Sequence, residues 1–145
     1  MSSSQRVDIG DVLRGRILVA EDDAELRALI GATLRDAGYE VVEASDGDVL
    51  IDKLADVLRP GQVSAPFDLI LSDIRMPNFS ALDVLVGARR FIGRIPVVLM
   101  TAFGDQNLHD RARWRGATLV LNKPVRLAEL CGTVERVFAA KSSTT

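Results

Sequence analysis

Several features that define other classes of protein are scarce in this chain of 145 residues. Its single cysteine, Cys131, excludes an intramolecular disulfide framework and a cysteine-rich metal site, and we expect it to be a small buried side chain. No apolar run approaches the roughly 20 residues needed to cross a bilayer, and residues 1–5 lack the apolar core of a secretory signal. We therefore expect a cytoplasmic protein that makes no membrane contact.

An excess of basic charge is also missing. The chain carries 18 basic and 20 acidic side chains, which gives a formal net charge of -2. Because general binding to phosphate backbones needs a basic excess, direct nucleic-acid binding is not expected. Aromatic residues make up only 5% of the chain and apolar residues 48%. This composition suits an aliphatic core with helices covering both faces of a sheet.

Strand-like apolar runs alternate with segments of helical spacing along most of the chain. This alternation predicts a single-domain α/β fold with a doubly wound, five-stranded parallel sheet and five helices. We expect residues 1–15 to be an N-terminal extension, residues 16–140 the folded domain, and residues 141–145 a disordered tail. The expected strands are 16–20, 40–44, 68–72, 95–100 and 118–121, and the expected helices are about 26–37, 46–58, 81–90, 105–115 and 125–140.

The residues that follow the strands carry the chemistry, because ligand sites of open parallel sheets form beyond the carboxyl ends of the strands. Three carboxylates follow the first strand, where a nucleotide-binding fold would place glycines. Carboxylates from two strand ends favour a hard divalent cation such as Mg²⁺, with Mn²⁺ as an alternative. The residues at the four strand ends are Glu21, Asp22 and Asp23, then Asp73, then Thr101, then Lys123.

Simpler interpretations exist for each of these residues alone. Asp23 is placed to cap the following helix, and Lys123 on its own resembles any surface lysine. Threonine ends many strands, so Thr101 alone indicates little. The functional interpretation depends on all of these positions sharing one edge of one sheet.

Four segments resemble the receiver domain of bacterial two-component response regulators, and the resemblance runs from about Arg16 to Ala140. The resemblance implies a flavodoxin-like sheet with strand order 2-1-3-4-5. It also implies that Asp73 is phosphorylated, and that Glu21, Asp22, Asp73 and the backbone carbonyl of Arg75 hold Mg²⁺. The segments are Ile17–Asp23 (ILVAEDD), Asp68–Pro77 (DLILSDIRMP), Val98–Asp105 (VLMTAFGD) and Lys123-Pro124, and Arg27 in the following helix supports the alignment of the acidic pair.

The same resemblance assigns a switch. Thr101 is the hydroxyl that moves toward the phosphoryl group, with the Ala102 N–H beside it. Lys123 bonds a phosphoryl oxygen, and Pro124 follows it through a cis peptide. The phosphoryl donor is a histidine of a sensor histidine kinase or a histidine phosphotransfer protein. The single histidine of this chain, His109, is expected on the surface of the fourth helix, away from the strand ends.

Several positions depart from the family pattern. Val120 occupies the place of the usual switch aromatic, so the usual coupling between the threonine and a ring is not expected. Ala81 replaces a common glycine and suggests a changed turn at residues 78–80, and Val125 replaces a common phenylalanine. Arg75 and Phe103 are bulky side chains near the site, and they predict slow autodephosphorylation because they hinder attacking water.

Output through contact with a downstream protein is the main expectation, with a possible homodimer through the face of the fourth helix and fifth strand. One alternative is a receiver-like binding module that acts constitutively without phosphorylation, which Val120 favours. A phosphohydrolase with an aspartyl nucleophile is a weaker alternative, because Arg75 stands where such enzymes place a second aspartate. A stand-alone regulator and a domain of a larger regulator or hybrid kinase both fit the sequence.

Overall fold

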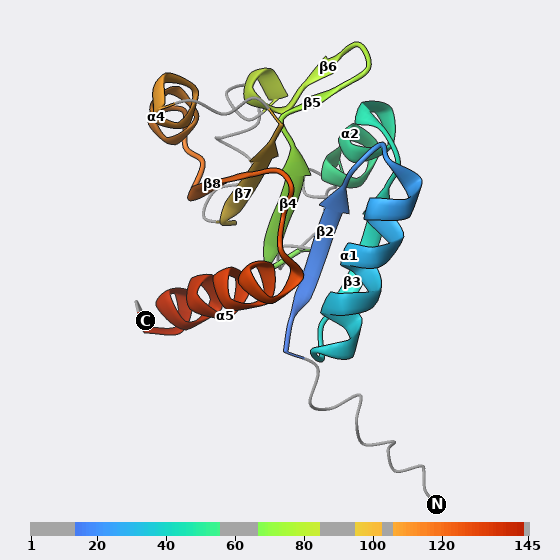
Figure 1. The fold of residues 1–145 in the computed structure, drawn as a ribbon, viewed down its shortest axis with the longest axis vertical. Coiled ribbons are helices and arrows are strands. Elements are labelled where there is room, and N and C mark those ends of the chain that lie inside the picture. Colours follow the sequence, from blue (N-terminus) through green and yellow to red (C-terminus); the bar gives the residue numbers. More distant parts are fainter. Residues whose placement is uncertain (1–13, 56–66, 85–94, 103–105, 144–145) are drawn as a thin grey trace, which may run out of the picture.

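The computed structural model describes residues 14–55, 67–84, 95–102 and 106–143. Its centre is a five-stranded parallel sheet with the order β3-β2-β4-β7-β8 (Figure 1). This order confirms the predicted sequence of strands, in which the first strand lies between the second and the third. The strands are β2 (Arg16–Ala20), β3 (Glu40–Ala44), β4 (Leu69–Asp73), β7 (Val97–Thr101) and β8 (Leu119–Asn122).

Helices cover both faces of this sheet (Figure 1). A third predicted helix begins at Ala81 and is described as far as Val84, while the rest of it lies outside the described residues. No helix within the described ranges is long and apolar enough to span a membrane. The remaining helices are α1 (Ala24–Asp36), α2 (Gly47–Ala55), α4 (Gln106–Trp114) and α5 (Leu127–Ser143).

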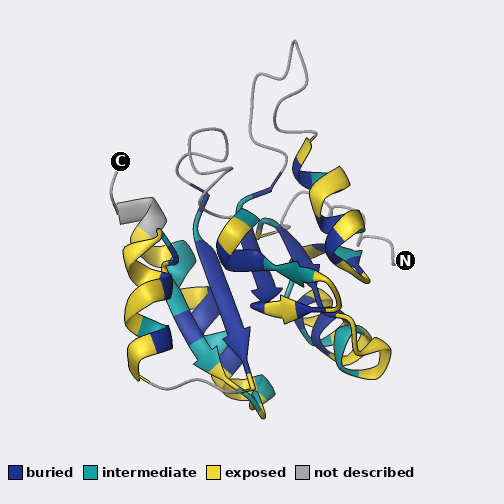
Figure 2. Ribbon diagram, turned by 90° about the horizontal axis from the view of Figure 1, so that it is seen from above, coloured by how far each residue is buried: buried dark blue, intermediate teal, exposed yellow. Residues whose placement is uncertain are grey.

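The core is divided into two apolar clusters by the sheet, because successive side chains of a strand point to opposite faces. In β2, Ile17 and Val19 pack toward α1 and α5, whereas Leu18 and Ala20 pack toward α2 and α4. The inner strands β2, β4 and β7 are almost wholly buried, the edge strands β3 and β8 are partly buried, and each helix turns a buried side to the sheet and an exposed side to solvent (Figure 2). This burial explains why the strands read as nearly continuous apolar runs in the sequence.

Short polar signals in the sequence set the helix ends. The Asp23 carboxylate accepts a hydrogen bond from the Leu26 N–H at 3.1 Å, and α1 begins there. Gly38 follows the helix with a φ of 101°, a conformation that glycine adopts without a steric penalty. The Asp46 carboxylate accepts from the Val49 N–H at 2.9 Å in the first turn of α2.

The ordered domain is slightly longer than predicted at both ends. The Arg14 N–H donates to the Gly38 carbonyl at 2.9 Å, and the Arg14 guanidinium lies 4.9 Å from the centre of the Tyr39 ring. This residue of the predicted extension therefore packs on the domain. At the other end α5 continues to Ser143, so residues 141–143 are helical and do not belong to a disordered tail as predicted.

A two-stranded hairpin directly after β4 was not predicted as strands. It pairs β5 (Arg75–Met76) with β6 (Phe79–Ser80) in antiparallel register. Asn78 has a φ of 59°, and asparagine tolerates this left-handed conformation in tight turns better than most residues. The sequence indicated a changed turn here, and the hairpin is the form that this turn takes.

The hairpin is pressed against the start of α2. A Cβ atom built on Gly47 would overlap the Phe79 ring, so a glycine is required at this helix position by close packing. Phe79 is half-buried and packs on the core cluster that includes Leu50 and Leu54 of α2. The segment that follows Asp73 is therefore anchored to α2.

Gly47→Ala is expected to lower the free energy of unfolding by about 1–3 kcal/mol, because the new methyl group must displace the Phe79 ring. Gly132→Ala is a matched control in α5, where an added Cβ meets only the flexible end of Arg136 at 3.4 Å. That control should be neutral or slightly stabilising, since alanine favours a helix. Urea unfolding measures both variants, and equal stability of the two would contradict the Phe79 contact.

Candidate functional site

Three charged side chains meet at the carboxyl edge of the sheet. Glu21 follows β2, Asp73 ends β4, and Lys123 follows β8. The Lys123 Nζ donates to the Glu21 Oε1 at 2.8 Å and to the Asp73 Oδ2 at 2.9 Å. Residues that are 102 and 50 positions from Lys123 in the chain thus form one ion-paired group. The structure brings together the strand-end residues that the sequence singled out.

A group of three carboxylates lies beside this lysine. Glu21, Asp22 and Asp73 each place a carboxylate oxygen within 4.8 Å of the others. Glu21 is 0% exposed and Asp73 6%, while Asp22 is exposed to solvent. Carboxylate oxygens that remain partly open to solvent suit Mg²⁺, because this ion retains several of its waters when it binds. The residues present therefore fit a hard divalent cation.

Burial and charge control the protonation of this group. The pKa of Asp73 is raised to about 6, and burial is the largest cause. The hydrogen bond from Lys123 lowers this pKa, whereas the nearby Glu21 charge raises it. Burial also opposes protonation of Lys123, but its hydrogen bonds to Glu21 and Asp73 and their negative charges raise its pKa on balance. Lys123 therefore stays an ammonium ion, and it is the main positive charge that the chain itself supplies to Asp73.

A second set of contacts fixes the acidic loop. The Arg27 side chain donates to the Glu21 backbone carbonyl at 2.9 Å and lies 3.4 Å from the Glu43 carboxylate, which also pairs with Arg35 at 2.9 Å. The Asp23 N–H donates to the Glu21 Oε2 at 3.1 Å. Both the backbone and the side chain of Glu21 are thus held in place. Ligands held in this way lose little conformational freedom when they bind an ion.

The residues predicted to form the switch lie beside this group. Thr101 ends β7, is buried, and accepts a backbone hydrogen bond from the Lys123 N–H at 2.8 Å. The Lys123-Pro124 peptide bond is cis, and Ala102 is exposed directly after the strand. Val120 is 6% exposed and packs in the core cluster on the α2 and α4 face. This position therefore holds a buried aliphatic side chain.

Three further residues that the sequence singled out and the structure describes are not part of this charged group. Arg75 is exposed in β5, two residues past Asp73, whereas Phe103 falls outside the described residues. His109 is half-buried in α4, and its Nε2 lies 2.9 Å from the Asn122 Oδ1 at the end of β8. It is therefore closer to the strand ends than the sequence indicated. Cys131 is half-buried against the cluster between α1 and α5.

The pairing of Arg27 with Glu43 was not predicted from the sequence, although Arg27 was marked as a support for the alignment. The signal was present, since Arg27 and Glu43 are opposite charges on neighbouring elements of an expected βαβ unit. However, many such pairs occur on protein surfaces, and sequence spacing alone does not distinguish them.

Comparison with known proteins gives the family. A family model described as "Response regulator receiver domain" matches residues 17–135. The transcriptional regulatory protein PdtaR of Mycobacterium tuberculosis is 35% identical over 123 residues, which are 83% of this chain and 55% of that protein. The DNA-binding transcriptional regulator NtrC of Escherichia coli is 31% identical over 126 residues, 87% of this chain and 25% of that protein. The chain thus spans about half or less of the length of these relatives.

Solved structures show the same architecture. The chemotaxis response regulator CheY4 of Vibrio cholerae superimposes with a TM-score of 0.73 at 29% identity, covering 84% of this chain and 97% of that one. A response regulator protein from Burkholderia multivorans is 34% identical with a TM-score of 0.66, covering 84% and 93%. The chain belongs to the response regulator receiver domains, the signalling modules of two-component systems.

Proposed function

We propose that this domain takes a phosphoryl group onto Asp73 in a reaction that requires Mg²⁺ or Mn²⁺, and that it signals through contacts with other proteins. The donor is a phosphohistidine of a sensor histidine kinase or a histidine phosphotransfer protein. The observation that carries the proposal is the position of Asp73. Its carboxylate lies within 4.8 Å of the oxygens of Glu21 and Asp22 and 2.9 Å from the Lys123 Nζ.

The chemistry follows from the charges of this group. An Asp73 oxygen attacks phosphorus, the P–N bond to the donor histidine breaks, and its electron pair stays on the imidazole nitrogen. A bound divalent cation would neutralise phosphoryl oxygens beside Glu21, Asp22, Asp73 and the Arg75 carbonyl. Lys123 supplies the second positive charge, and the buried position of Asp73 keeps bulk water from its carboxylate.

The response to phosphorylation is proposed to involve Thr101 and the Ala102 N–H, which lie at the end of the strand next to β4. Lys123 would exchange a carboxylate partner for a phosphoryl oxygen. Val120 has no ring to move, so the change must reach the surface through other side chains or the backbone. Slow hydrolysis of the aspartyl phosphate is proposed because Arg75 is a bulky side chain two residues past Asp73 and because the sequence places a second bulky residue, Phe103, two positions after Thr101.

Incubation with Mg²⁺ and acetyl phosphate, read by intact mass, tests the proposal. One phosphoryl addition is expected on the wild type and none on Asp73→Asn or in EDTA. Asp48→Asn is the matched control, because Asp48 is an exposed aspartate in α2 and should leave the addition unchanged. An addition that persists in Asp73→Asn would show that another residue is the acceptor.

A constitutive binding module is the second candidate, and the buried, ring-free Val120 side chain at the position of the usual switch aromatic is the observation that favours it. Under this alternative the wild type acquires no phosphoryl group with Mg²⁺ and acetyl phosphate, although it folds normally. The mass experiment therefore separates the two candidates directly.

A further inference from the structure

Trp114 is an unusual surface residue. It is the single tryptophan of the chain, it ends α4, and it is 90% exposed. The other large exposed apolar side chains among the described residues are Leu29 and Ile51, and each keeps about half of its surface covered. An exposed tryptophan is unfavourable in an isolated domain and is characteristic of surfaces that bind another molecule.

Charged residues surround this tryptophan on one side of α4. A shallow hollow of about 340 Å³ is lined by Asp110, Arg111, Trp114 and Arg115. The Arg115 N–H donates to the Arg111 carbonyl at 3.1 Å, so the helical turn continues through Arg115 and both guanidinium groups lie on the same side. The Asp110 carboxylate accepts from Gln106 at 2.8 Å. The hollow therefore presents two cations and an aromatic surface beside one carboxylate that already has a partner.

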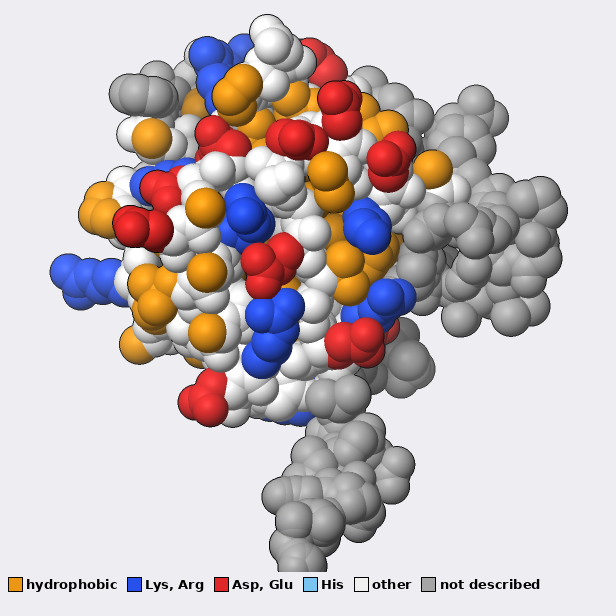
Figure 3. Space-filling view, turned by 90° about the vertical axis from the view of Figure 1, so that its right-hand side faces the viewer, with side chains coloured by type: hydrophobic (Ala, Val, Ile, Leu, Met, Phe, Trp, Pro, Cys, Tyr) orange, Lys and Arg blue, Asp and Glu red, His pale blue; other side chains and the backbone are white. Residues whose placement is uncertain are grey.

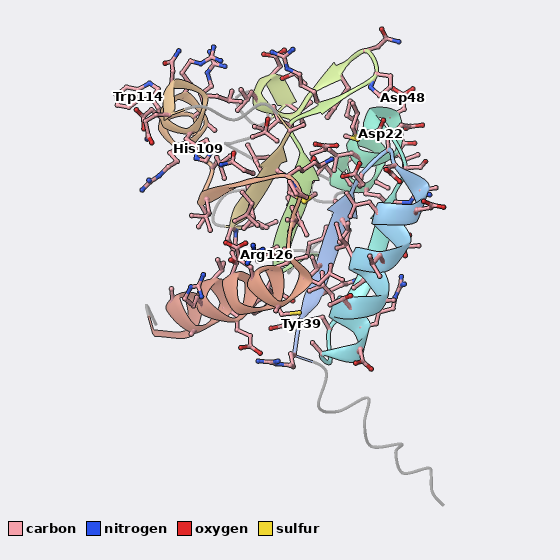
Figure 4. The ribbon with its side chains drawn as sticks, viewed as in Figure 1. Asp22, Tyr39, Asp48, His109, Trp114 and Arg126 are labelled. Atoms are coloured by element: carbon pink, nitrogen blue, oxygen red, sulfur yellow. The ribbon has the colours of Figure 1, made fainter. Side chains whose placement is uncertain are left out.

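This hollow is separate from the strand-end site. Leu108 and Ala112 form the buried side of α4, and His109 lies toward β8 through its contact with Asn122. Trp114 projects outward from α4, whereas His109 lies between α4 and β8 (Figure 4). The hollow is thus on the outer side of α4, away from the face of the fourth helix and fifth strand at which partner contacts were expected from the sequence.

We propose that the hollow lined by Asp110, Arg111, Trp114 and Arg115 binds an acidic segment of a partner protein that also carries an apolar side chain. The partner's carboxylates pair with Arg111 and Arg115, whose planar groups match carboxylates in a bidentate manner. Its apolar side chain covers the Trp114 ring. Tryptophan and arginine together are the residues most enriched among the energetically dominant contacts of protein interfaces.

Two other occupants fit the structure less well. The face that carries α1 and α2 has acidic side chains gathered near the end where the strands finish (Figure 3). A second copy bound there would make a head-to-tail contact, which generates open chains unless the rotation closes a ring. A nucleic acid is disfavoured because two arginines and a net charge of -2 offer little neutralisation of a phosphate backbone.

Fluorescence anisotropy of a labelled peptide tests this surface in the unphosphorylated full chain, so the result does not depend on the proposed role of Asp73. The probe is a short peptide of glutamates around a Leu-Phe pair. A matched peptide with glutamine at each glutamate and a single-stranded oligothymidylate serve as comparisons. We expect the acidic peptide to bind at least ten times more tightly than either, and to shift the Trp114 emission to shorter wavelength as the ring leaves water.

Variants localise the binding. The double substitution Arg111→Glu/Arg115→Glu and the single substitution Trp114→Ala should each weaken the acidic peptide at least tenfold. Arg126→Glu should not, because Arg126 is exposed at the start of α5 and does not line the hollow (Figure 4). Equal binding of the acidic and glutamine peptides, preference for the oligonucleotide, or an emission shift that depends only on protein concentration would each overturn the proposal.

Discussion

Lys123→Met is expected to destabilise the metal-free protein by roughly 3–5 kcal/mol at neutral pH, the usual consequence of removing one partner from a buried ion pair. Methionine retains most of the side-chain volume, so the loss reports charge and hydrogen bonding. The Lys123 Nζ is 2.8 Å from Glu21 and 2.9 Å from Asp73. Without it, two buried carboxylates face each other with no ammonium group between them.

Urea unfolding in EDTA measures this loss, and Lys53→Met in α2 is the matched control at a lysine remote from the strand ends. The double variant Lys123→Met/Asp73→Asn should recover part of the stability, because it leaves one carboxylate fewer to be neutralised. Saturating Mg²⁺ should also reduce the deficit. A loss of less than about 1 kcal/mol in EDTA, typical of an exposed pair, would contradict the buried arrangement.

Asp73→Asn is expected to raise the unfolding free energy of the metal-free protein by about 2–3 kcal/mol at neutral pH, whereas Lys123→Met lowers it. The folded protein holds the Asp73 proton up to a pKa of about 6, whereas an unfolded aspartate releases it near 3.8. Between these values the folded state binds more protons than the unfolded state. The stabilising contribution of Asp73 is therefore present below about pH 4 and is lost as the pH rises through about 6.

The measurement is the difference in unfolding free energy between the wild type and Asp73→Asn from pH 4 to pH 8 in EDTA. The difference should be small at the acidic end, should grow in favour of asparagine between about pH 4 and pH 6, and should level off above pH 6. Addition of Mg²⁺ should make the wild type the more stable of the two proteins. The wild type is stabilised by binding the ion, whereas the variant with asparagine at position 73 binds it weakly. A pH-independent difference would show that burial of the Asp73 charge is not its cause.

The sheet and the strand-end residues were predictable from the sequence because both depend on local signals. Runs such as Ile17–Ala20 and Leu69–Leu71 are too apolar for anything but a buried strand, and parallel strands must end at a common edge. Once the strands are placed, Glu21, Asp73 and Lys123 have to converge. The structure confirms the sheet order, and the roles of these residues remain predictions.

The hairpin and the contacts of Arg14 were not predictable in the same way. Each strand of the hairpin has only two residues, which is too short for any alternation of apolar and polar residues to appear. Its position depends on Phe79 meeting Gly47, a contact between distant parts of the chain. Arg14 is ordered by Tyr39 and Glu135, and a lone arginine before a strand carries no signal of such partners.

The close fit of Phe79 against Gly47 also constrains how this protein can diverge. Neither position can be exchanged freely, because any side chain at 47 needs space that only a smaller group at 79 would leave. Drift at the two sites is therefore expected to be correlated among close orthologues, with glycine retained wherever the hairpin keeps an aromatic ring. Substitutions in the turn after Asp73 and at the beginning of α2 would then occur together.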